Sequence, residues 1–195
     1  VPTDPPRDAA TVVMLRDTPR GLEVFLLKRH GLSNVLGEAY VFPGGKLDRS
    51  DCQLDPTAHL DQDPARLHAT LGEPALDVPT ATGLYVAALR EAFEESRVLF
   101  CHDSAHARAA LVHDRTQSFN QMLAHLRVRL QTQHVLPWSR WITPRLPAVG
   151  NKRFDTRFFV AAVPPQQDAT HDNHEATESV WLPPRAAPAQ YWDNR

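Results

Sequence analysis

The segment 83–99, GLYVAALREAFEESRVL, constrains the fold most strongly, because its apolar residues recur with the period of an α-helix. One stripe of this predicted helix is apolar and contains Val86, Leu89 and Phe93. The opposite side gathers three carboxylates within about 100° of arc, those of Glu91, Glu94 and Glu95. We therefore predict a helix over 83–99 that buries one face and presents the acidic one.

Four further segments have the composition of β-strands. Residues 10–17 (ATVVMLRD) and 22–29 (LEVFLLKR) are rich in branched and aromatic side chains, and the turn between them predicts a hairpin. Residues 152–163 and 179–182 are also predicted strands, each closed by a proline pair. A second amphipathic helix is predicted in 118–134, with an apolar stripe of Phe119, Met122, Leu123, Leu126 and Leu130.

Prolines and glycines interrupt the remaining pattern. Pro43, Gly44 and Gly45 are predicted to end any regular element. Residues 52–82 are polar, carry four prolines and are predicted to be a partly helical insertion. We expect this insertion to close over a substrate and select it, as long functional loops often do.

The whole chain has the size and composition of one globular domain, over residues 1–195. The net charge of −2 provides no basic field for nucleic acid. No apolar run is long enough for a membrane span, and the polar start does not resemble a signal peptide, so the cytoplasm is the expected compartment. Cys52 and Cys101 lie far apart, which favours free thiols over a disulfide or a zinc site.

Three carboxylates on one helical face repel one another, so a compensating positive charge is expected. Arg90 lies one turn before Glu94 and can hold that carboxylate, but one guanidinium cannot neutralise three acids. Divalent cations such as Mg²⁺ or Mn²⁺ prefer such oxygen ligands, often together with substrate phosphates. The alternative for the acidic segment by itself is a solvated helix face.

The segments GGKLDRSD and REAFEESRV together resemble the Nudix box, G-x5-E-x7-R-E-U-x-E-E-x-G-U, in which U is aliphatic. Gly45 matches the first glycine, and Asp51 stands at the first glutamate. The core and the aliphatic positions of the pattern are matched by Arg90, Glu91, Ala92, Glu94, Glu95 and Val98.

This resemblance has three departures. The spacer between Asp51 and Arg90 has 38 residues instead of seven, aspartate replaces glutamate, and Arg97 occupies the last glycine position. A longer surface loop costs little entropy. Because a Cβ disfavours the backbone that the family glycine allows, we expect the exit of this helix to differ.

The order FPGGKLD, ALREAFEE, WITP, RFDTRFFVA and ESVWLPP resembles the Nudix branch that includes peroxisomal and mitochondrial coenzyme A diphosphatases. The resemblance implies an α/β Nudix fold, with a mixed β-sheet sandwiched between helices. It also implies metal-dependent hydrolysis of a nucleoside diphosphate linked to another group, with coenzyme A or acyl-coenzyme A as leading substrate. A dinucleotide or nucleotide sugar, such as NADH or ADP-ribose, is the second alternative.

Carried over by position, the resemblance implies metal ligation by Glu94, Glu95 and the backbone carbonyl of Gly45. Glu91 would be a further ligand or a base that orients water, and Arg90 would hold the carboxylates in place. Asp51 is the doubtful member, because its side chain is one methylene shorter than the family glutamate.

Other residues are weighed against plainer interpretations. Glu175 and Glu178 are candidates for an additional acid, or else solvated loop charges. Candidate substrate contacts are Arg29, Phe42, Arg153 and Phe154, to which we add Arg157 and Trp141. For these arginines the alternative is an ordinary surface position, and for the aromatic residues it is core packing. His171 and His174 lack a third ligand, which favours exposed histidines over a metal site.

Two classes of function are left open: the active hydrolase, and a binding or regulatory module that keeps the fold without turnover. Asp51, Arg97 and the insertion favour the module, but the intact acidic core favours the enzyme. The expected partner is a small nucleotide-diphosphate substrate, not nucleic acid or a membrane. The oligomeric state is open, with a homodimer as one alternative, and similar proteins are expected to continue beyond Arg195.

Overall fold

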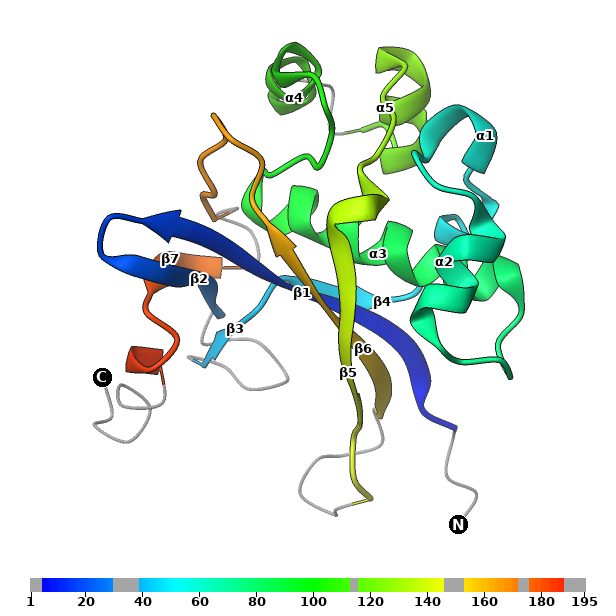
Figure 1. Cartoon of the computed structure of the whole chain (residues 1–195), viewed down its shortest axis with the longest axis horizontal. Coiled ribbons are helices and arrows are strands. Elements are labelled where there is room, and N and C mark those ends of the chain that lie inside the picture. The colour runs from blue at the N-terminus through cyan, green and yellow to red at the C-terminus, as the bar shows by residue number, and fades with distance from the viewer. Residues whose placement is uncertain (1–4, 30–38, 113–115, 146–152, 172–175, 188–195) are drawn as a thin grey trace.

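A computed structural model describes residues 5–29, 39–112, 116–145, 153–171 and 176–187. These residues form a seven-stranded sheet of order β3-β2-β1-β6-β5, with β4 beside β1 and β7 beside β2. The strands are β1 (Arg7–Thr18), β2 (Gly21–Arg29), β3 (Tyr40–Val41), β4 (Gly44–Lys46), β5 (Val135–Ile142), β6 (Phe154–Ala162) and β7 (Ala176–Leu182). Because β1 runs parallel to β6 and the other pairs are antiparallel, the sheet is mixed (Figure 1).

Five α-helices and two 3-10 turns accompany the sheet in the described residues. They are η1 (Asp51–Gln53), α1 (Pro56–His59), α2 (Pro64–Leu71), α3 (Val78–Ser96), α4 (Ser104–Leu111), α5 (Phe119–Leu126) and η2 (Thr132–His134). Figure 1 shows α3 beside β1 and β4, with the shorter helices around it. The mixed sheet and its helices confirm the predicted α/β class. None of the described helices is both long enough and apolar enough to span a bilayer.

The predicted hairpin is present, because β1 and β2 pair antiparallel and Thr18 faces Gly21. The core lies between α3 and one face of the strands, where Tyr85 stacks on Phe159 with ring centroids 4.7 Å apart. Both cysteines are free thiols, as predicted: Cys101 is buried and Cys52 half-buried. Burial raises the pKa of both thiols above the ordinary value.

The main helix begins five residues earlier than predicted, at Val78. Asp77 caps it by accepting a 2.7 Å hydrogen bond from the Thr80 amide, and Pro79 lies in the first turn, where no amide partner is needed. Every residue of 81–90 is buried, so the expectation of one exposed face is wrong for this part. The helix packs on all sides because α2 and η1 cover the side away from the sheet.

The segment 52–82 is partly helical, as predicted, and its prolines begin helices instead of breaking them. Asp55 caps α1 and Asp63 caps α2, and in each case a proline follows in the first turn. A proline at the first helical position has a suitable φ and lacks a donor that would otherwise be unpaired. Two Asp–Pro pairs therefore mark two helix starts.

The prediction that Gly44 and Gly45 end regular structure is wrong, because they form β4 and pair with β1. A Cβ on Gly44 would lie 2.7 Å from the Ala10 carbonyl oxygen and 2.8 Å from the Thr11 Cα. Only glycine allows the strands to approach so closely, so the glycine pair marks a close contact.

The helix predicted in 118–134 ends early. α5 stops at Leu126, and Arg127 follows with a φ of 54°, in the left-handed region. Leu130 is still buried, but it lies beyond the helix in isolated β-bridges to Leu60 and Cys101.

The sequence also missed β5, which forms one edge of the sheet order in the described residues. This strand carries four exposed apolar side chains: Leu136 (58%), Trp138 (66%), Trp141 (64%) and Ile142 (44%). Core packing, the alternative considered for Trp141, is therefore wrong. Its side chain lies on the edge strand, where no further strand covers it among the described residues.

Candidate functional site

The last turns of α3 carry the predicted acidic group. The helix ends after Ser96, and Arg97 takes the left-handed conformation, with φ 64° and ψ 16°. Its amide donates a 2.9 Å hydrogen bond to the carbonyl of Phe93. The expected difference in the helix exit is therefore not found, because arginine adopts here the backbone that glycine would favour.

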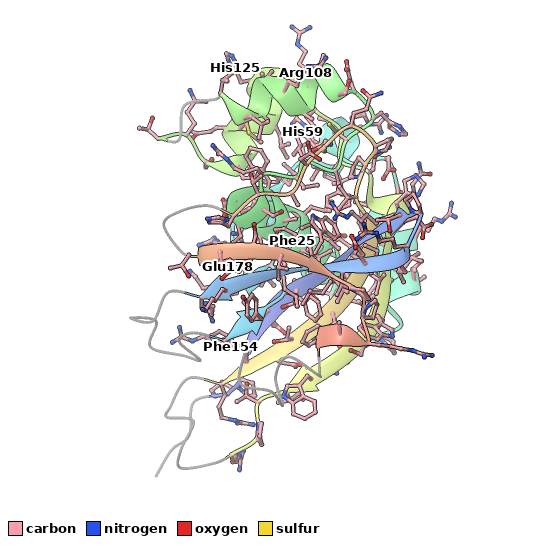
Figure 2. The ribbon with its side chains drawn as sticks, turned by 90° about the vertical axis from the view of Figure 1, so that its left-hand side faces the viewer. Phe25, His59, Arg108, His125, Phe154 and Glu178 are labelled. Carbon is pink, nitrogen blue, oxygen red and sulfur yellow. The ribbon has the colours of Figure 1, made fainter. Side chains whose placement is uncertain are left out.

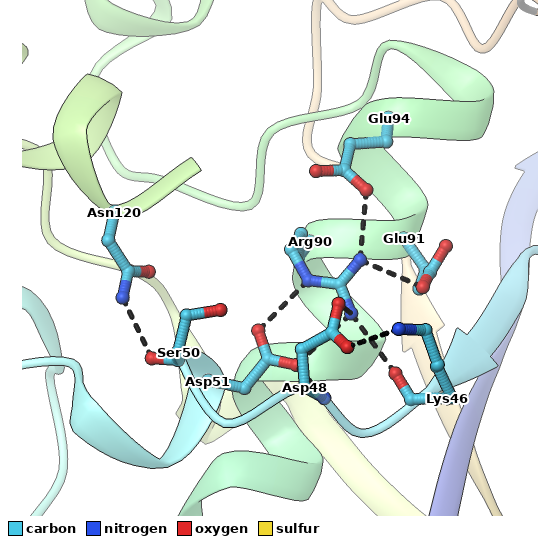
Figure 3. Close-up of polar contacts among 8 residues, drawn as sticks. All are labelled: Lys46, Asp48, Ser50, Asp51, Arg90, Glu91, Glu94 and Asn120. Atoms are coloured by element: carbon cyan, nitrogen blue, oxygen red, sulfur yellow. Dashed lines mark hydrogen bonds and ion pairs between the residues drawn. The ribbon is translucent and has the colours of Figure 1, made fainter. Parts of the chain in front are cut away.

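Arg90 is the centre of the site and is only 8% exposed. Its Nη1 donates to Glu91 Oε1 at 2.8 Å and to Glu94 Oε2 at 2.9 Å, as Figure 3 shows. Its Nη2 donates at 3.2 Å to the carbonyl of Lys46, the last residue of β4. Burial alone would lower the pKa of Arg90, but the hydrogen bonds to Asp51 and the surrounding acids outweigh it and raise the pKa above the ordinary arginine value. The guanidinium is thus a permanent cation that fixes the carboxylates.

Asp51 reaches Arg90 despite its short side chain. Its two oxygens accept from Arg90 Nε at 2.9 Å and from Nη2 at 3.1 Å, a bidentate ion pair. Asp51 is 1% exposed and also accepts a 2.9 Å hydrogen bond from the amide of Asp48. Because η1 brings its backbone close to α3, the missing methylene does not prevent the contact.

Glu95 and Glu91 contact the glycine pair of β4. The Gly44 amide donates to Glu95 Oε2 at 3.0 Å, and Glu95 is 9% exposed. A Cβ on Gly45 would lie 2.6 Å from the Glu91 carboxyl carbon, so Glu91 occupies the space that a side chain at position 45 would need. The residues that match the box therefore meet in one place, with β4 on one side and α3 on the other.

Residues 6–195 match the family model described as the NUDT19 Nudix domain. The chain belongs to this family. This Nudix domain is 27% identical over 207 residues to the acyl-coenzyme A diphosphatase NUDT19 of Xenopus laevis, covering 87% of this chain and 54% of that protein. It is 27% identical over 219 residues to the Homo sapiens protein of the same name, covering 84% and 58%. The predicted resemblance is confirmed, although the chain spans only a little over half the length of these relatives.

Solved structures share the fold of this Nudix domain. A Nudix hydrolase from Alicyclobacillus acidocaldarius has a TM-score of 0.73 and 24% identity, covering 98% of this chain and 84% of that one. A MutT/Nudix family protein from Enterococcus faecalis has a TM-score of 0.51 and 13% identity, covering 93% and 45%. These similarities support the Nudix fold alone.

The donors of the site fit a hard divalent cation, because they are carboxylate and carbonyl oxygens. The Glu91 carboxylate can lie here only because Gly45 has no side chain. In the described part of this Nudix domain, however, no group of three or more His, Cys, Asp or Glu residues is arranged as a ready metal cage. Glu91 and Glu94 are turned onto Arg90, and Glu95 onto the Gly44 amide. A common ion would therefore require these carboxylates to turn away from their present partners.

Glu178 lies on β7 and is exposed (Figure 2). It stands opposite Lys28 of β2, and its carboxylate forms a hydrogen bond with Tyr40. Burial, followed by the charge and hydrogen bond of Glu178, raises the pKa of Tyr40. His171 Nδ1 lies 3.1 Å from Ser179 Oγ, so this histidine has a protein partner. His174 and Glu175 lie outside the described residues.

The candidate substrate contacts lie on several elements. Arg29 ends β2, and Phe42 is half-buried between β3 and β4. Arg153 donates to the Thr143 carbonyl at 2.9 Å, and Phe154 begins β6 (Figure 2). None of the hydrogen bonds or ion pairs found for these four described residues joins them to Arg90.

Arg157 is not a surface arginine, because it is buried among acidic side chains. It is 3% exposed and pairs with Asp8, with Asp155 and with Glu73, whose Oε2 lies 2.8 Å from its Nη2. Burial lowers the pKa of Arg157, but hydrogen bonds to Glu73 and Asp8 outweigh this effect and raise it. The candidate role of Arg157 in phosphate binding is therefore corrected to a structural one.

Sequence reasoning missed three contributors to the site. Gly44 supplies the amide that Glu95 binds, Asp48 supplies the amide that Asp51 binds, and Asn120 holds the turn before Asp51 through the Ser50 carbonyl. The glycine pair was a usable signal for Gly44. Asn120 gave no signal, because it lies 70 positions from its partner.

Proposed function

We propose that this chain hydrolyses the diphosphate of a nucleoside diphosphate linked to another group, with coenzyme A or acyl-coenzyme A as leading substrate. One observation carries the proposal: a buried Arg90 that fixes Asp51, Glu91 and Glu94 beside the glycine pair. The relatives are named acyl-coenzyme A diphosphatases, and this supports the substrate class. The intact acidic core favours turnover over a module that only binds.

Each residue of the site has a proposed role. Glu91, Glu94 and Glu95, with the Gly45 carbonyl, would hold Mg²⁺ or Mn²⁺, and Glu178 is a candidate further ligand. When bound, the cation neutralises diphosphate charge and acidifies a water molecule. Arg90 gathers Glu91 and Glu94 at the end of α3, so that these carboxylates are close to one another when the cation binds. Glu91 is either a ligand or the base that orients the attacking water.

Substrate binding is proposed for Arg29, Phe42, Arg153 and Phe154. Guanidinium groups suit phosphate oxygens, and aromatic rings suit the face of a base. The insertion 52–82 remains the proposed selector of substrate. Two contacts hold the insertion in place and oppose its free closure over a substrate. Glu73 binds Arg157 of β6, and the Leu60 carbonyl accepts a 2.7 Å hydrogen bond from Arg129 Nη2. Selection would then come from the fixed shape of the insertion.

The test is hydrolysis across coenzyme A, acyl-coenzyme A, NADH, ADP-ribose, diadenosine polyphosphates and nucleotide sugars, with Mg²⁺ or Mn²⁺ and with chelator. We expect metal-dependent release of 3′,5′-ADP from coenzyme A or its acyl form. Preference for another member of the panel would support diphosphate hydrolysis but contradict coenzyme A as the substrate. No turnover on any member would favour the binding module.

We also propose that this chain forms a homodimer. The exposed apolar side chains of β5 offer a surface for it. Sedimentation analysis of the purified chain tests this point.

A further inference from the structure

A long segment of the chain separates Asp51 from Arg90 in the sequence. Residues 52–89, 38 in number, separate them, so covalent connection constrains their approach only weakly. The side chains nevertheless form a buried bidentate pair. Non-covalent contacts must therefore hold the turn that carries Asp51, and two of them come from elements outside that turn.

The first contact is between η1 and the side of α3. Cys52 lies directly against Gly83, a buried residue in the second turn of the helix. A Cβ on Gly83 would lie 2.7 Å from Cys52 Sγ and 3.2 Å from both its Cα and its backbone nitrogen. The missing side chain of Gly83 thus makes the space in which η1 rests on α3.

The second contact comes from α5. Asn120 Nδ2 donates a 2.8 Å hydrogen bond to the carbonyl of Ser50, the residue before Asp51 (Figure 3). The same carbonyl accepts a 3.1 Å bond from the Gln53 amide, which closes η1. Asn120 is itself fixed, because it lies in the first turn of a helix with a complete capping box at Ser118 and Gln121.

We propose that Gly83 and Asn120 are positioning residues for Asp51, and through it for Arg90 and its carboxylates. They replace the constraint that a short spacer would provide: Gly83 sets how closely η1 approaches α3, and Asn120 sets the orientation of the Ser50 peptide. This inference rests on the proposed function, because that function assigns a role in catalysis to Arg90 and the carboxylates that it contacts. Neither residue touches the substrate in this proposal.

The first experiment is Gly83→Ala, compared with Cys52→Ala and the double variant. The new methyl group displaces Cys52, so we expect kcat to fall about tenfold or more with little change in KM, because small misplacements of catalytic groups are costly. Calorimetric Mn²⁺ binding should weaken as well. Cys52→Ala alone should resemble the parent chain. In the double variant the 2.7 Å contact with Sγ is gone and the 3.2 Å contacts with the backbone of residue 52 remain, so both kcat and Mn²⁺ binding should recover in part.

The second experiment is Asn120→Ala, with Gln131→Ala as matched control. Gln131 also loses one exposed amide hydrogen bond, its 2.7 Å contact with His102, but it does not touch η1. We expect Asn120→Ala to lower kcat several-fold and weaken Mn²⁺ binding, while the control changes neither. Urea denaturation should give the two variants similar stability.

The outcomes separate this inference from the proposed function. If the parent chain turns over no diphosphate, the function fails, and the Mn²⁺ titrations still decide the positioning roles. Unchanged Mn²⁺ binding in both Gly83→Ala and Asn120→Ala would overturn the inference. A double variant that shows none of this partial recovery would overturn the Cys52 Sγ contact as the cause of the loss in Gly83→Ala.

Discussion

Arg97 ends α3 in a backbone conformation that residues with a Cβ seldom adopt, at φ 64°. Glycine would remove this strain, at the cost of more freedom in the unfolded chain. We expect Arg97→Gly to raise the free energy of unfolding by about 0.5–1 kcal/mol without changing turnover. Urea denaturation measures it, and Arg127→Gly at φ 54° is the matched variant on α5. A loss of stability would mean that the Arg97 side chain contributes more than its backbone costs.

Glu95 accepts the Gly44 amide, a role that glutamine can keep through its carbonyl oxygen. Glu95→Gln should therefore fold normally, with turnover lower by about two orders of magnitude or more, because a charge that holds the cation is lost. The measurement is kcat at saturating metal, beside the melting temperature. The control is Glu23→Gln, which removes an exposed pair with Arg16. Turnover close to the parent value in Glu95→Gln would contradict the assignment of this site.

At the residue scale, the resemblance to the box implied which side chains lie together, and Arg90 does contact Asp51, Glu91 and Glu94. Their burial could not be predicted. Glu95 is buried only because β4 packs against the helix, and this depends on a glycine pair that propensity assigns to a turn.

At the element scale, the sequence pattern predicted the hairpin and the centre of α3. It failed at helix starts that are set by a capping residue. Asp77, followed by Pro79, moves the start of α3 to Val78, and Asp55 and Asp63 begin two helices in a segment without apolar period. β5 was missed because Pro137 argues against a strand and the ladder shifts register between Pro137 and Ser139.

Glu73 attaches the insertion to the sheet, and its charge makes this attachment depend on pH. A hydrogen bond from Arg157 holds the pKa of Glu73 below the ordinary value of 4.5, although burial opposes the shift. Because this pKa is lower in the folded than in the unfolded chain, the stabilisation is complete above a pH of about 4.5 and is lost as pH falls through the folded value.

We expect Glu73→Gln to lower the free energy of unfolding by about 1–3 kcal/mol at neutral pH, because Arg157 loses a charged partner in a buried position. The difference from the parent should shrink as pH falls below about 4.5 and through the lowered pKa of Glu73 in the folded parent, because the parent then becomes protonated as well. Urea denaturation at neutral pH and at a series of acidic pH values measures it. A difference that stays constant across this range would show that the carboxylate charge is not what stabilises the contact.

At the scale of the whole molecule, the sheet has one apolar edge. Trp138 and Trp141 on β5 are 66% and 64% exposed, so the burial of these two side chains contributes little to the free energy of folding. Replacing both by serine should change the free energy of unfolding by only about 0.5 kcal/mol. Light scattering at rising concentration should show less association, because exposed apolar edges attract other chains. A loss of several kcal/mol would mean that these rings are covered in the folded protein.

The parallel pairing of β1 with β6 has a consequence for biosynthesis. Arg7 of β1 faces Phe154 of β6, which lies 147 positions later in the chain. When β1 leaves the ribosome, its parallel partner β6 has not yet been synthesised, and the apolar residues of β1 stay without this partner while the intervening residues are added. Strand pairs that are this far apart in sequence form late in folding, and the intermediates that precede them are prone to aggregate. The newborn chain should therefore depend on chaperones or slow release until the codons of β6 have been read.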